Sequence, residues 1–279
     1  MPTTVKLNDG NEMPTMAFGT GSVMKEKEDV TGFVEQALDS GFDHIDTAPI
    51  YYNENQVGAA IRESGLSREE LYITTKYDFG GPIQKAVRDS LDKLGLKSVD
   101  LYLIHGPNLI EKDVEGSWKE FEKIKEDGLA KSIGVSNFNV EQLRKVIKIA
   151  RIKPAVNQIN FNPYNYASQK AAVEYAAKHG IVTAGYSGLT PLSRSPGGPV
   201  DPVVSTIAAR LNVSAAQVLL KWVRSKGVAV VTTSSKKERL AEYLAVEELP
   251  DLTAAEIAAI DAAGAKGPPS TASPVVHFL

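Results

Sequence analysis

Amphipathic stretches and short apolar runs alternate along the chain. Apolar residues recur at three- and four-residue spacing, as in a helix with one buried face, over 29–41, 55–65, 82–95, 115–128, 140–151, 168–180 and 214–227. A short apolar run predicted to be a strand follows each of them, over 43–47, 71–76, 99–105, 131–137, 155–161, 181–187 and 228–234. Strands that alternate with helices of this length predict parallel βαβ units.

The alternation occurs about eight times when MAFGT, residues 16–20, is counted as the first strand, and eight such units close a (β/α)₈ barrel. The preceding VKLNDGNEMP predicts a β-hairpin that turns at Asp9 and Gly10 and plugs the barrel floor. Two extra helices are predicted over 203–212 and 253–264, the first after a Pro- and Gly-rich loop over 187–202. The predicted fold class is therefore α/β. It is a TIM barrel with an N-terminal hairpin and two extra helices, forming one domain over residues 1–279.

Length and composition suit this fold and argue against several partners. The 279 residues match a barrel of about 250. Lys and Arg number 31 against 34 Asp and Glu, so no basic field points to nucleic acid or to an anionic membrane. The N-terminus lacks a signal-peptide pattern, and no 18 apolar residues run together. The absence of cysteine fits a reducing compartment. We therefore expect a cytosolic protein without a nucleic-acid or membrane partner.

Three predicted strands end in side chains that carry chemistry. Asp46, Lys76 and His105 close the strands, and Tyr51 lies five residues beyond Asp46. Strand ends share one rim in a parallel barrel, so the four groups could converge. A Tyr hydroxyl titrates near pH ~10, and a nearby Lys charge should lower that pKa. Such a hydroxyl could protonate a developing alkoxide, which is half of a carbonyl reduction.

Each of these residues also has a plainer interpretation. An Asp and a Lys near strand ends are most often a structural ion pair, and His105 alone would be read as a core histidine. Lys76 could also form a Schiff base in a (β/α)₈ lyase. Their joint placement with Tyr51 favours the proton-transfer function. We expect Tyr52 to pack or to line the pocket.

Two other kinds of site are not predicted. GTGSVM, residues 19–24, starts like a nucleotide loop but lacks the third Gly of a Rossmann motif. The four histidines are scattered along the sequence, so no metal site is expected.

Six segments, taken in their order along the chain, resemble a known protein family. GFDHIDTAPIYYNENQVGAAI, LYITTK, LYLIHGP, IGVSNFN, VNQINFNPYN and TTSSKKERLAE together resemble the aldo-keto reductases over nearly the whole chain. The resemblance implies a barrel that binds NADP(H) and reduces aldehydes or ketones to alcohols by hydride transfer, without metal or flavin. It implies that Tyr51 donates the proton, that Lys76 and Asp46 tune it, and that His105 orients the substrate. It leaves open a cofactor-sensing regulatory subunit, and we expect a monomer or weak dimer.

The same resemblance implies a set of cofactor ligands. Those expected are Ser136, Asn137 and Gln158 at the carboxamide, Tyr186 stacked on the nicotinamide, and Ser187, Leu189, Thr233, Ser234, Lys236, Arg239 and Glu242 along the rest of the cofactor. Arg239 matches the family's ligand of the 2′-phosphate, and Glu242 matches an adenosine contact. A common family form carries Lys where this chain has Thr233. The phosphate would then rely on Ser234, Lys236 and Arg239, which still predicts a preference for NADPH.

The expected substrate pocket is open. Gly21 and Gly106 stand where many relatives carry Trp, so two walls are predicted to be cut back. Tyr77, Asn108 and the tail near His277 and Phe278 are the other expected contacts. Such a pocket should accept bulky or α-dicarbonyl compounds, and it resembles the fungal-type reductases that act on α-keto amides, conjugated polyketones and related ketolactones.

Overall fold

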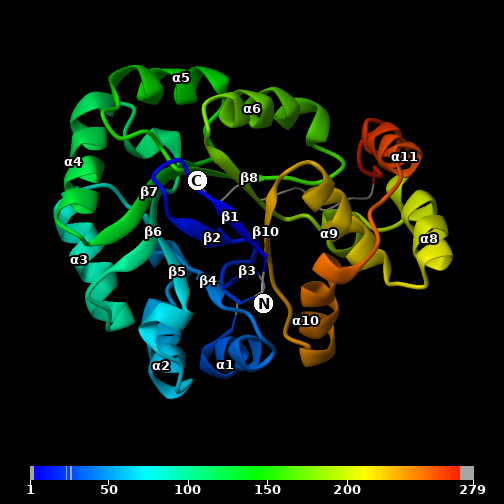
Figure 1. The fold of residues 1–279 in the computed structure, drawn as a ribbon, viewed down its shortest axis with the longest axis horizontal. Coiled ribbons are helices and arrows are strands. Elements are labelled where there is room, and N and C mark those ends of the chain that lie inside the picture. The colour runs from blue at the N-terminus through cyan, green and yellow to red at the C-terminus, as the bar shows by residue number, and fades with distance from the viewer. Residues whose placement is uncertain (1–2, 23, 26, 271–279) are drawn as a thin grey trace.

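A closed parallel barrel forms the centre of the computed structural model, which describes residues 3–22, 24–25 and 27–270 (Figure 1). Its strands are β3 (Met16–Gly19), β4 (His44–Asp46), β5 (Tyr72–Tyr77), β6 (Val99–Ile104), β7 (Ala130–Ser136), β8 (Val156–Asn160), β9 (Val182–Tyr186) and β10 (Ala229–Thr232). Consecutive strands pair in parallel, and β10 closes the ring on β3. The predicted α/β barrel is therefore confirmed.

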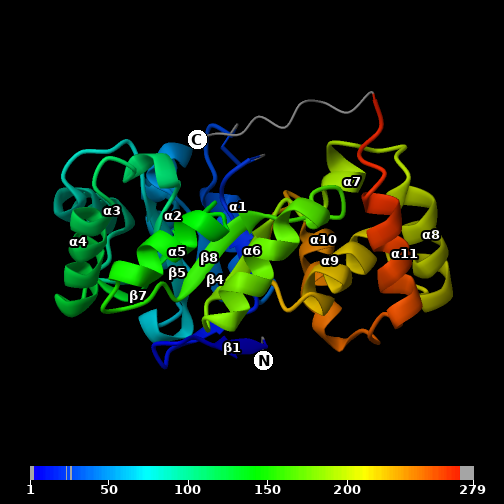
Figure 2. The same ribbon diagram turned by 90° about the horizontal axis from the view of Figure 1, so that it is seen from above.

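Helices surround the barrel and follow the predicted order (Figures 1 and 2). They are α1 (Thr31–Asp39), α2 (Glu54–Glu63), α3 (Ile83–Leu94), α4 (Val114–Glu126), α5 (Val140–Ile149), α6 (Tyr166–Lys178), α7 (Thr190–Ser193), α8 (Val200–Leu211), α9 (Ala215–Ser225), α10 (Lys237–Leu244) and α11 (Ala254–Gly264). The two predicted extra helices, α8 and α11, contact each other at one end of the molecule.

The segment over 187–202 is more helical than predicted. It contains α7, and α8 begins at Val200 rather than at Val203. Proline reads as a helix breaker, but it is tolerated in the first turn, where the missing N–H has no partner in any case. Pro191 occupies that position in α7, and Pro199 caps α8.

The N-terminal hairpin closes the barrel floor as predicted. Strands β1 (Thr4–Lys6) and β2 (Glu12–Pro14) pair in antiparallel fashion around a turn in which Gly10 has a φ of +91°. Leu7 and Met13 are buried and belong to the apolar cluster that fills the barrel interior. The hairpin is thus fixed by apolar contacts as well as by its own hydrogen bonds.

Barrel strands bury both faces in two separate apolar clusters. One fills the interior and includes Leu101 and Leu103, and the other lies between the strands and the helices and includes Tyr102 and Ile104. Successive side chains of a strand point to opposite faces, so each strand supplies both clusters. This alternation decides which residues near the rim can reach a ligand.

The predicted substrate contact of Tyr77 is wrong for this reason. Lys76 belongs to the interior group of side chains, so the next side chain of β5 points outward. Tyr77 is 3% exposed, lies in the cluster under the helices and packs edge-on against Phe121. Its hydroxyl donates to the Gly81 carbonyl at 2.8 Å.

No single helix in the described part of the chain is long and apolar enough to cross a membrane. By length and composition only α8 and α9 taken together pass that test, and they are bent by 98° at their junction.

Candidate active site

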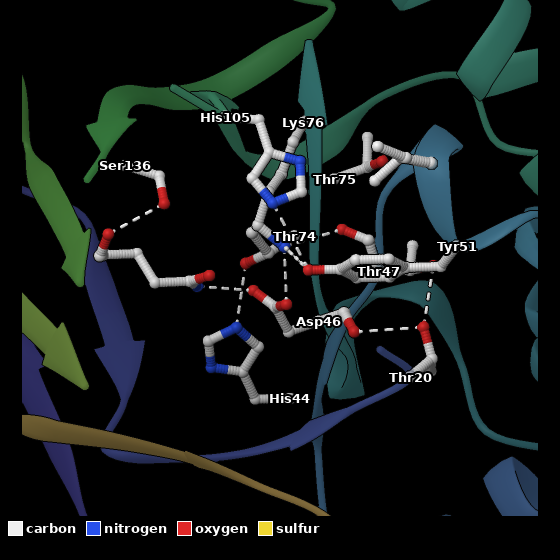
Figure 3. A network of polar contacts seen from close by, with 12 residues as sticks. Thr20, His44, Asp46, Thr47, Tyr51, Thr74, Thr75, Lys76, His105 and Ser136 are labelled. Carbon is white, nitrogen blue, oxygen red and sulfur yellow. Dashed lines mark hydrogen bonds and ion pairs between the residues drawn. The ribbon is translucent and has the colours of Figure 1, made fainter. Parts of the chain in front are cut away.

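The four side chains expected to carry the chemistry meet at the rim formed by the carboxyl ends of the strands (Figure 3). Asp46 ends β4, Lys76 lies near the end of β5, and His105 directly follows β6. Tyr51 ends a short 3₁₀ turn, Pro49–Tyr51, that begins with proline and returns the chain towards the barrel. The turn is what brings the phenol of Tyr51 over the strand ends.

Lys76 and Asp46 form a buried ion pair at the base of the site. Lys76 Nζ donates to Asp46 Oδ1 at 2.7 Å and to the Thr47 carbonyl at 3.0 Å. Gln158 Nε2 donates to the other carboxylate oxygen of Asp46 at 2.7 Å. Burial acts to lower the pKa of Lys76, but the charge of Asp46 and the neighbouring Tyr51 raise it overall. Lys76 therefore remains a fixed ammonium below Tyr51.

Tyr51 lies between this ammonium and a histidine. Its hydroxyl oxygen is 3.4 Å from Lys76 Nζ and 3.4 Å from His105 Nε2. Burial raises the pKa of Tyr51 to about 12, although the charge of Lys76 acts to lower it. The expectation of a lowered pKa is wrong for this structure. The sequence places the charges, but it does not reveal that the phenol is buried deeply enough for desolvation to outweigh them.

Asp78 is a site residue that the sequence analysis missed. Its Oδ1 lies 2.7 Å from His105 Nδ1, and its Oδ2 accepts a 3.3 Å hydrogen bond from the Ile50 backbone N–H. Both Asp78 and His105 are buried. The strand period could have found it, because the residue two positions after Lys76 lies on the same face of the chain.

Gly21 lies directly against the Tyr51 ring. A Cβ built at Gly21 would lie 2.9 Å from Tyr51 Cζ and 3.2 Å from two further ring carbons. The Tyr51 ring therefore occupies the place that a Cβ at position 21 would take. The open pocket wall expected at this position stays a prediction. Glycine lets the backbone approach the ring this closely without moving it.

Other expected substrate residues lie on the same side of the rim. Gly106 is buried with an extended φ of −156°, and Asn108 is exposed on the 3₁₀ turn Pro107–Leu109. Tyr52 is 75% exposed, in a left-handed conformation with φ of +57°, and its ring lies 6.0 Å from the Phe79 ring. It is therefore not a core residue, and its place in the pocket lining stays a prediction. His277 and Phe278 lie outside the described residues.

The side chains expected at the carboxamide form a connected group. Ser136 Oγ donates to the Gln158 carbonyl at 2.8 Å, and Asn137 Nδ2 donates to Ser136 Oγ at 3.1 Å and to the His105 carbonyl at 3.0 Å. The Tyr186 hydroxyl donates to Asn137 Oδ1 at 2.9 Å. Asn137 adopts a left-handed φ of +65°, which Asn tolerates better than most residues. The strand ends of β7, β8 and β9 thereby present amide and hydroxyl groups together.

Two expected cofactor residues follow β9 directly. Ser187 has a φ of +62°, and Leu189 is the residue before α7; both are partly buried. They continue the rim from Tyr186 towards α7.

The start of α10 is suited to an anion. Ser234 Oγ accepts from the Lys236 backbone N–H at 3.0 Å. Lys236 and Arg239 are exposed and form no ion pair within the described part of the chain, and the buried Thr233 Oγ1 has no hydrogen-bond partner there. Unpaired cations and an unpartnered hydroxyl at a helix N-terminus fit the phosphates of a dinucleotide. Glu242 is partly buried one turn further along α10.

Comparisons with known proteins identify the family of this chain. The Aldo/keto reductase family model matches residues 14–265. A "NAD/NADP-dependent indole-3-acetaldehyde reductase" of Schizosaccharomyces pombe is 40% identical over 84% of this chain and 86% of that protein. A "NADPH-dependent alpha-keto amide reductase" of Saccharomyces cerevisiae is 35% identical, with shares of 94% and 91%. The crystal structure of the Bombyx mori aldo-keto reductase AKR2E4 in complex with NADP superposes with a TM-score of 0.84 at 34% identity, covering 94% of this chain and 92% of that one. The chain belongs to the aldo/keto reductase family.

Proposed function

We propose that this chain is an NADPH-dependent carbonyl reductase that converts aldehydes or ketones, including bulky and α-dicarbonyl compounds, to alcohols. The observation that carries the proposal is the partly buried hydroxyl of Tyr51, held 3.4 Å from both Lys76 Nζ and His105 Nε2. Family membership supports the reaction type. The names of the alpha-keto amide reductase and of the NADP-bound relative support the cofactor and the substrate class.

Tyr51 is the proposed proton donor to the carbonyl oxygen. With a pKa of about 12 its hydroxyl is fully protonated at neutral pH, so the acid is always loaded. As the proton leaves, the Lys76 ammonium offsets the negative charge that develops on the phenol oxygen. Asp46, held in turn by Gln158, keeps Lys76 in place.

Bound NADPH would supply the hydride. Ser136, Asn137 and Gln158 are the proposed ligands of its carboxamide, and the Tyr186 ring supports the nicotinamide. Gln158 Nε2 donates one of its two hydrogens to Asp46, so the amide oxygen and the second N–H are the groups proposed to face a ligand. Ser187, Leu189, Thr233, Ser234, Lys236, Arg239 and Glu242 are proposed along the remainder of the cofactor. Gly106 and Asn108 are proposed on the substrate side.

The direct test follows NADPH absorbance during incubation with panels of aldehydes, ketones and α-dicarbonyls. We expect substrate-dependent oxidation, with the bulky α-dicarbonyls among the substrates. A borohydride trap tests the Schiff-base alternative for Lys76. No trapped adduct is expected, because the raised pKa leaves little of the neutral amine that such chemistry needs. A lack of NADPH oxidation with every compound would overturn the proposed function.

Replacing Arg239 by Ala should weaken NADPH binding much more than NADH binding. A guanidinium grips a phosphate through two hydrogen bonds, whereas the ribose hydroxyl of NADH offers it no charge. We expect a loss of about tenfold to a hundredfold in NADPH affinity, since charge-assisted hydrogen bonds contribute roughly 1.5–3 kcal/mol. Fluorescence titration with both cofactors measures the difference.

Arg88→Ala is the matched control, because Arg88 is an exposed arginine on α3 whose side chain bonds, among the described residues, to Gln84 of the same helix. It should leave both affinities unchanged. Equal losses for NADPH and NADH in Arg239→Ala would show that the residue only supports α10.

Replacing Gly21 by Ala should lower turnover without unfolding the protein. The added methyl would stand 2.9 Å from Tyr51 Cζ, so the ring must shift by several tenths of an ångström. Small misplacements of a reacting group are costly, and about 10²-fold for 1 Å is typical. We therefore expect a loss of roughly tenfold to a hundredfold in kcat. Gly32→Ala on α1, where no atom lies within 4 Å of the new Cβ, is the control. Unchanged turnover in Gly21→Ala would show that the ring position is not critical.

A further inference from the structure

Asp78 is a buried carboxylate next to the site that the proposed function does not use. It forms no ion pair with a lysine or an arginine within the described part of the chain, and His105 Nδ1 lies 2.7 Å from Asp78 Oδ1. The second oxygen, Oδ2, accepts from the Ile50 N–H at 3.3 Å, which fixes the carboxylate plane. The aspartate is therefore held in one orientation against one ring nitrogen.

We propose that Asp78 is a positioning residue that holds His105 with its proton on Nδ1, so that Nε2 can accept the Tyr51 proton and return it. The proposal rests on the proposed reductase function and deepens it. A carboxylate accepts hydrogen bonds and cannot donate, so the nitrogen that faces it carries the hydrogen. The neutral ring then presents the lone pair of Nε2 to the Tyr51 hydroxyl, 3.4 Å away.

Two hydrogen bonds result: the Tyr51 hydroxyl donates to His105 Nε2, and His105 Nδ1–H donates to Asp78. The arrangement is like that of a Ser-His-Asp triad, with a phenol in place of the serine. The raised pKa of Tyr51 explains why such a relay is needed, because it makes loss of the phenol proton unfavourable. A free phenolate is unfavourable in the buried site even with Lys76 beside it. His105 can give a proton to Tyr51, or take one from it, while Tyr51 exchanges a proton with the substrate. The phenol then stays neutral.

The proton step balances in both directions. In carbonyl reduction the Tyr51 O–H bond breaks and an O–H bond forms on the former carbonyl oxygen. Solvent water then supplies a proton to Nε2 of the neutral His105, and His105 passes this proton to Tyr51 and returns to its neutral form. In alcohol oxidation each bond change is reversed, and Asp78 offsets the positive charge left on the ring. The hydride moves separately, as in the proposed function.

This arrangement differs from a His105 that only orients the carbonyl. Such a residue needs a hydrogen on Nε2 while neutral, and therefore the opposite tautomer. Asp78→Asn separates the two possibilities. If the Asn carbonyl keeps the bond from Ile50 N–H, its amide N–H faces Nδ1 and drives the ring hydrogen to Nε2. The variant thus converts the relay form of His105 into the orienting form.

The experiment is nitrogen-15 NMR of the resting full-length protein, with the His105 signals identified by their loss in His105→Gln; the chain has four histidines. We expect the wild type to carry hydrogen on Nδ1 and Asp78→Asn to carry it on Nε2. Asp100→Asn is the control, because Asp100 is an equally buried carboxylate at the opposite end of β6. It should leave the His105 tautomer unchanged.

Turnover is measured in parallel, because the relay predicts that kcat of Asp78→Asn falls about 10²-fold while NADPH affinity is retained. Hydrogen on Nε2 in neutral wild-type His105 would overturn the proposal. A switched tautomer with kcat kept or increased would overturn it as well, because the orienting form would then suffice. The NMR result does not depend on activity, so failure of the proposed reductase function would be recognised separately by the absence of NADPH oxidation.

Discussion

Replacing Tyr51 by Phe should reduce carbonyl reduction by about 10²- to 10⁴-fold, equivalent to roughly 3–5 kcal/mol of barrier. The change removes one oxygen atom, the hydroxyl that lies between Lys76 and His105 and is the proposed proton donor. Ring packing against Gly21 and the edge-to-face contact with His105 remain available. Single-turnover measurement of NADPH oxidation reports the chemical step directly.

Two controls test whether a lower rate in Tyr51→Phe comes from loss of the proton donor. NADPH affinity, measured by fluorescence titration, should change little, because Tyr51 is not among the proposed cofactor ligands. Tyr52→Phe removes a hydroxyl from the adjacent, largely exposed ring and should leave turnover intact. If Tyr51→Phe kept a tenth of the wild-type rate while chemistry was rate-limiting, Tyr51 could not be the acid.

Much of the fold could be predicted because its determinants are local. The three- and four-residue spacing of apolar residues marks helices such as α3 and α9, and glycines such as Gly95 adopt the left-handed conformation that ends them. The hairpin could be predicted from Asp9-Gly10 alone, since Gly10 takes a positive φ. The helix α7 could not be predicted, because a proline such as Pro191 is equally typical of a loop and of the first turn of a helix.

The site was predicted less completely, because its chemistry depends on how deeply each side chain is buried and on which way it points in the folded protein. Convergence of Asp46, Lys76 and His105 follows from strand order, and the structure brings them together. The raised pKa of Tyr51 follows from burial, which no local pattern shows. Successive side chains of a strand point to opposite faces, so this alternation alone places Tyr77 outside the barrel and Asp78 on the same side as Lys76.

Replacing Lys76 by Met should be the most damaging change to stability as well as to activity. Lys76 and Asp46 are both buried, at 0% and 2% exposure, so removing the cation leaves Asp46 with Gln158 but without a compensating charge. Breaking a buried ion pair in this way typically costs about 3–5 kcal/mol. This is a large share of the free energy of unfolding of a domain, which is about 5–15 kcal/mol. Turnover should fall too, because the charge that favours ionisation of Tyr51 is lost.

The pH dependence of this stability loss has a defined sign. The folded-state pKa of Lys76 is raised above its unfolded value of about 10.5, so its contribution is fully present below that pH and is lost as pH rises through the folded pKa. The difference in unfolding free energy between wild type and Lys76→Met should therefore be constant between about pH 6 and pH 9. Urea unfolding at several pH values in that window measures it.

The double variant Asp46→Asn/Lys76→Met separates structural from chemical effects. An Asn at position 46 removes the uncompensated charge, and its side-chain oxygen can still accept from Gln158. We expect the double variant to recover most of the stability lost in Lys76→Met, because the penalty comes from the orphaned carboxylate rather than from lost packing. Its turnover should stay as low as that of the single variant, since the ammonium beside Tyr51 is absent from both. If stability and turnover recovered together, Lys76 would act only by holding the fold, and its proposed role beside the phenol would be wrong.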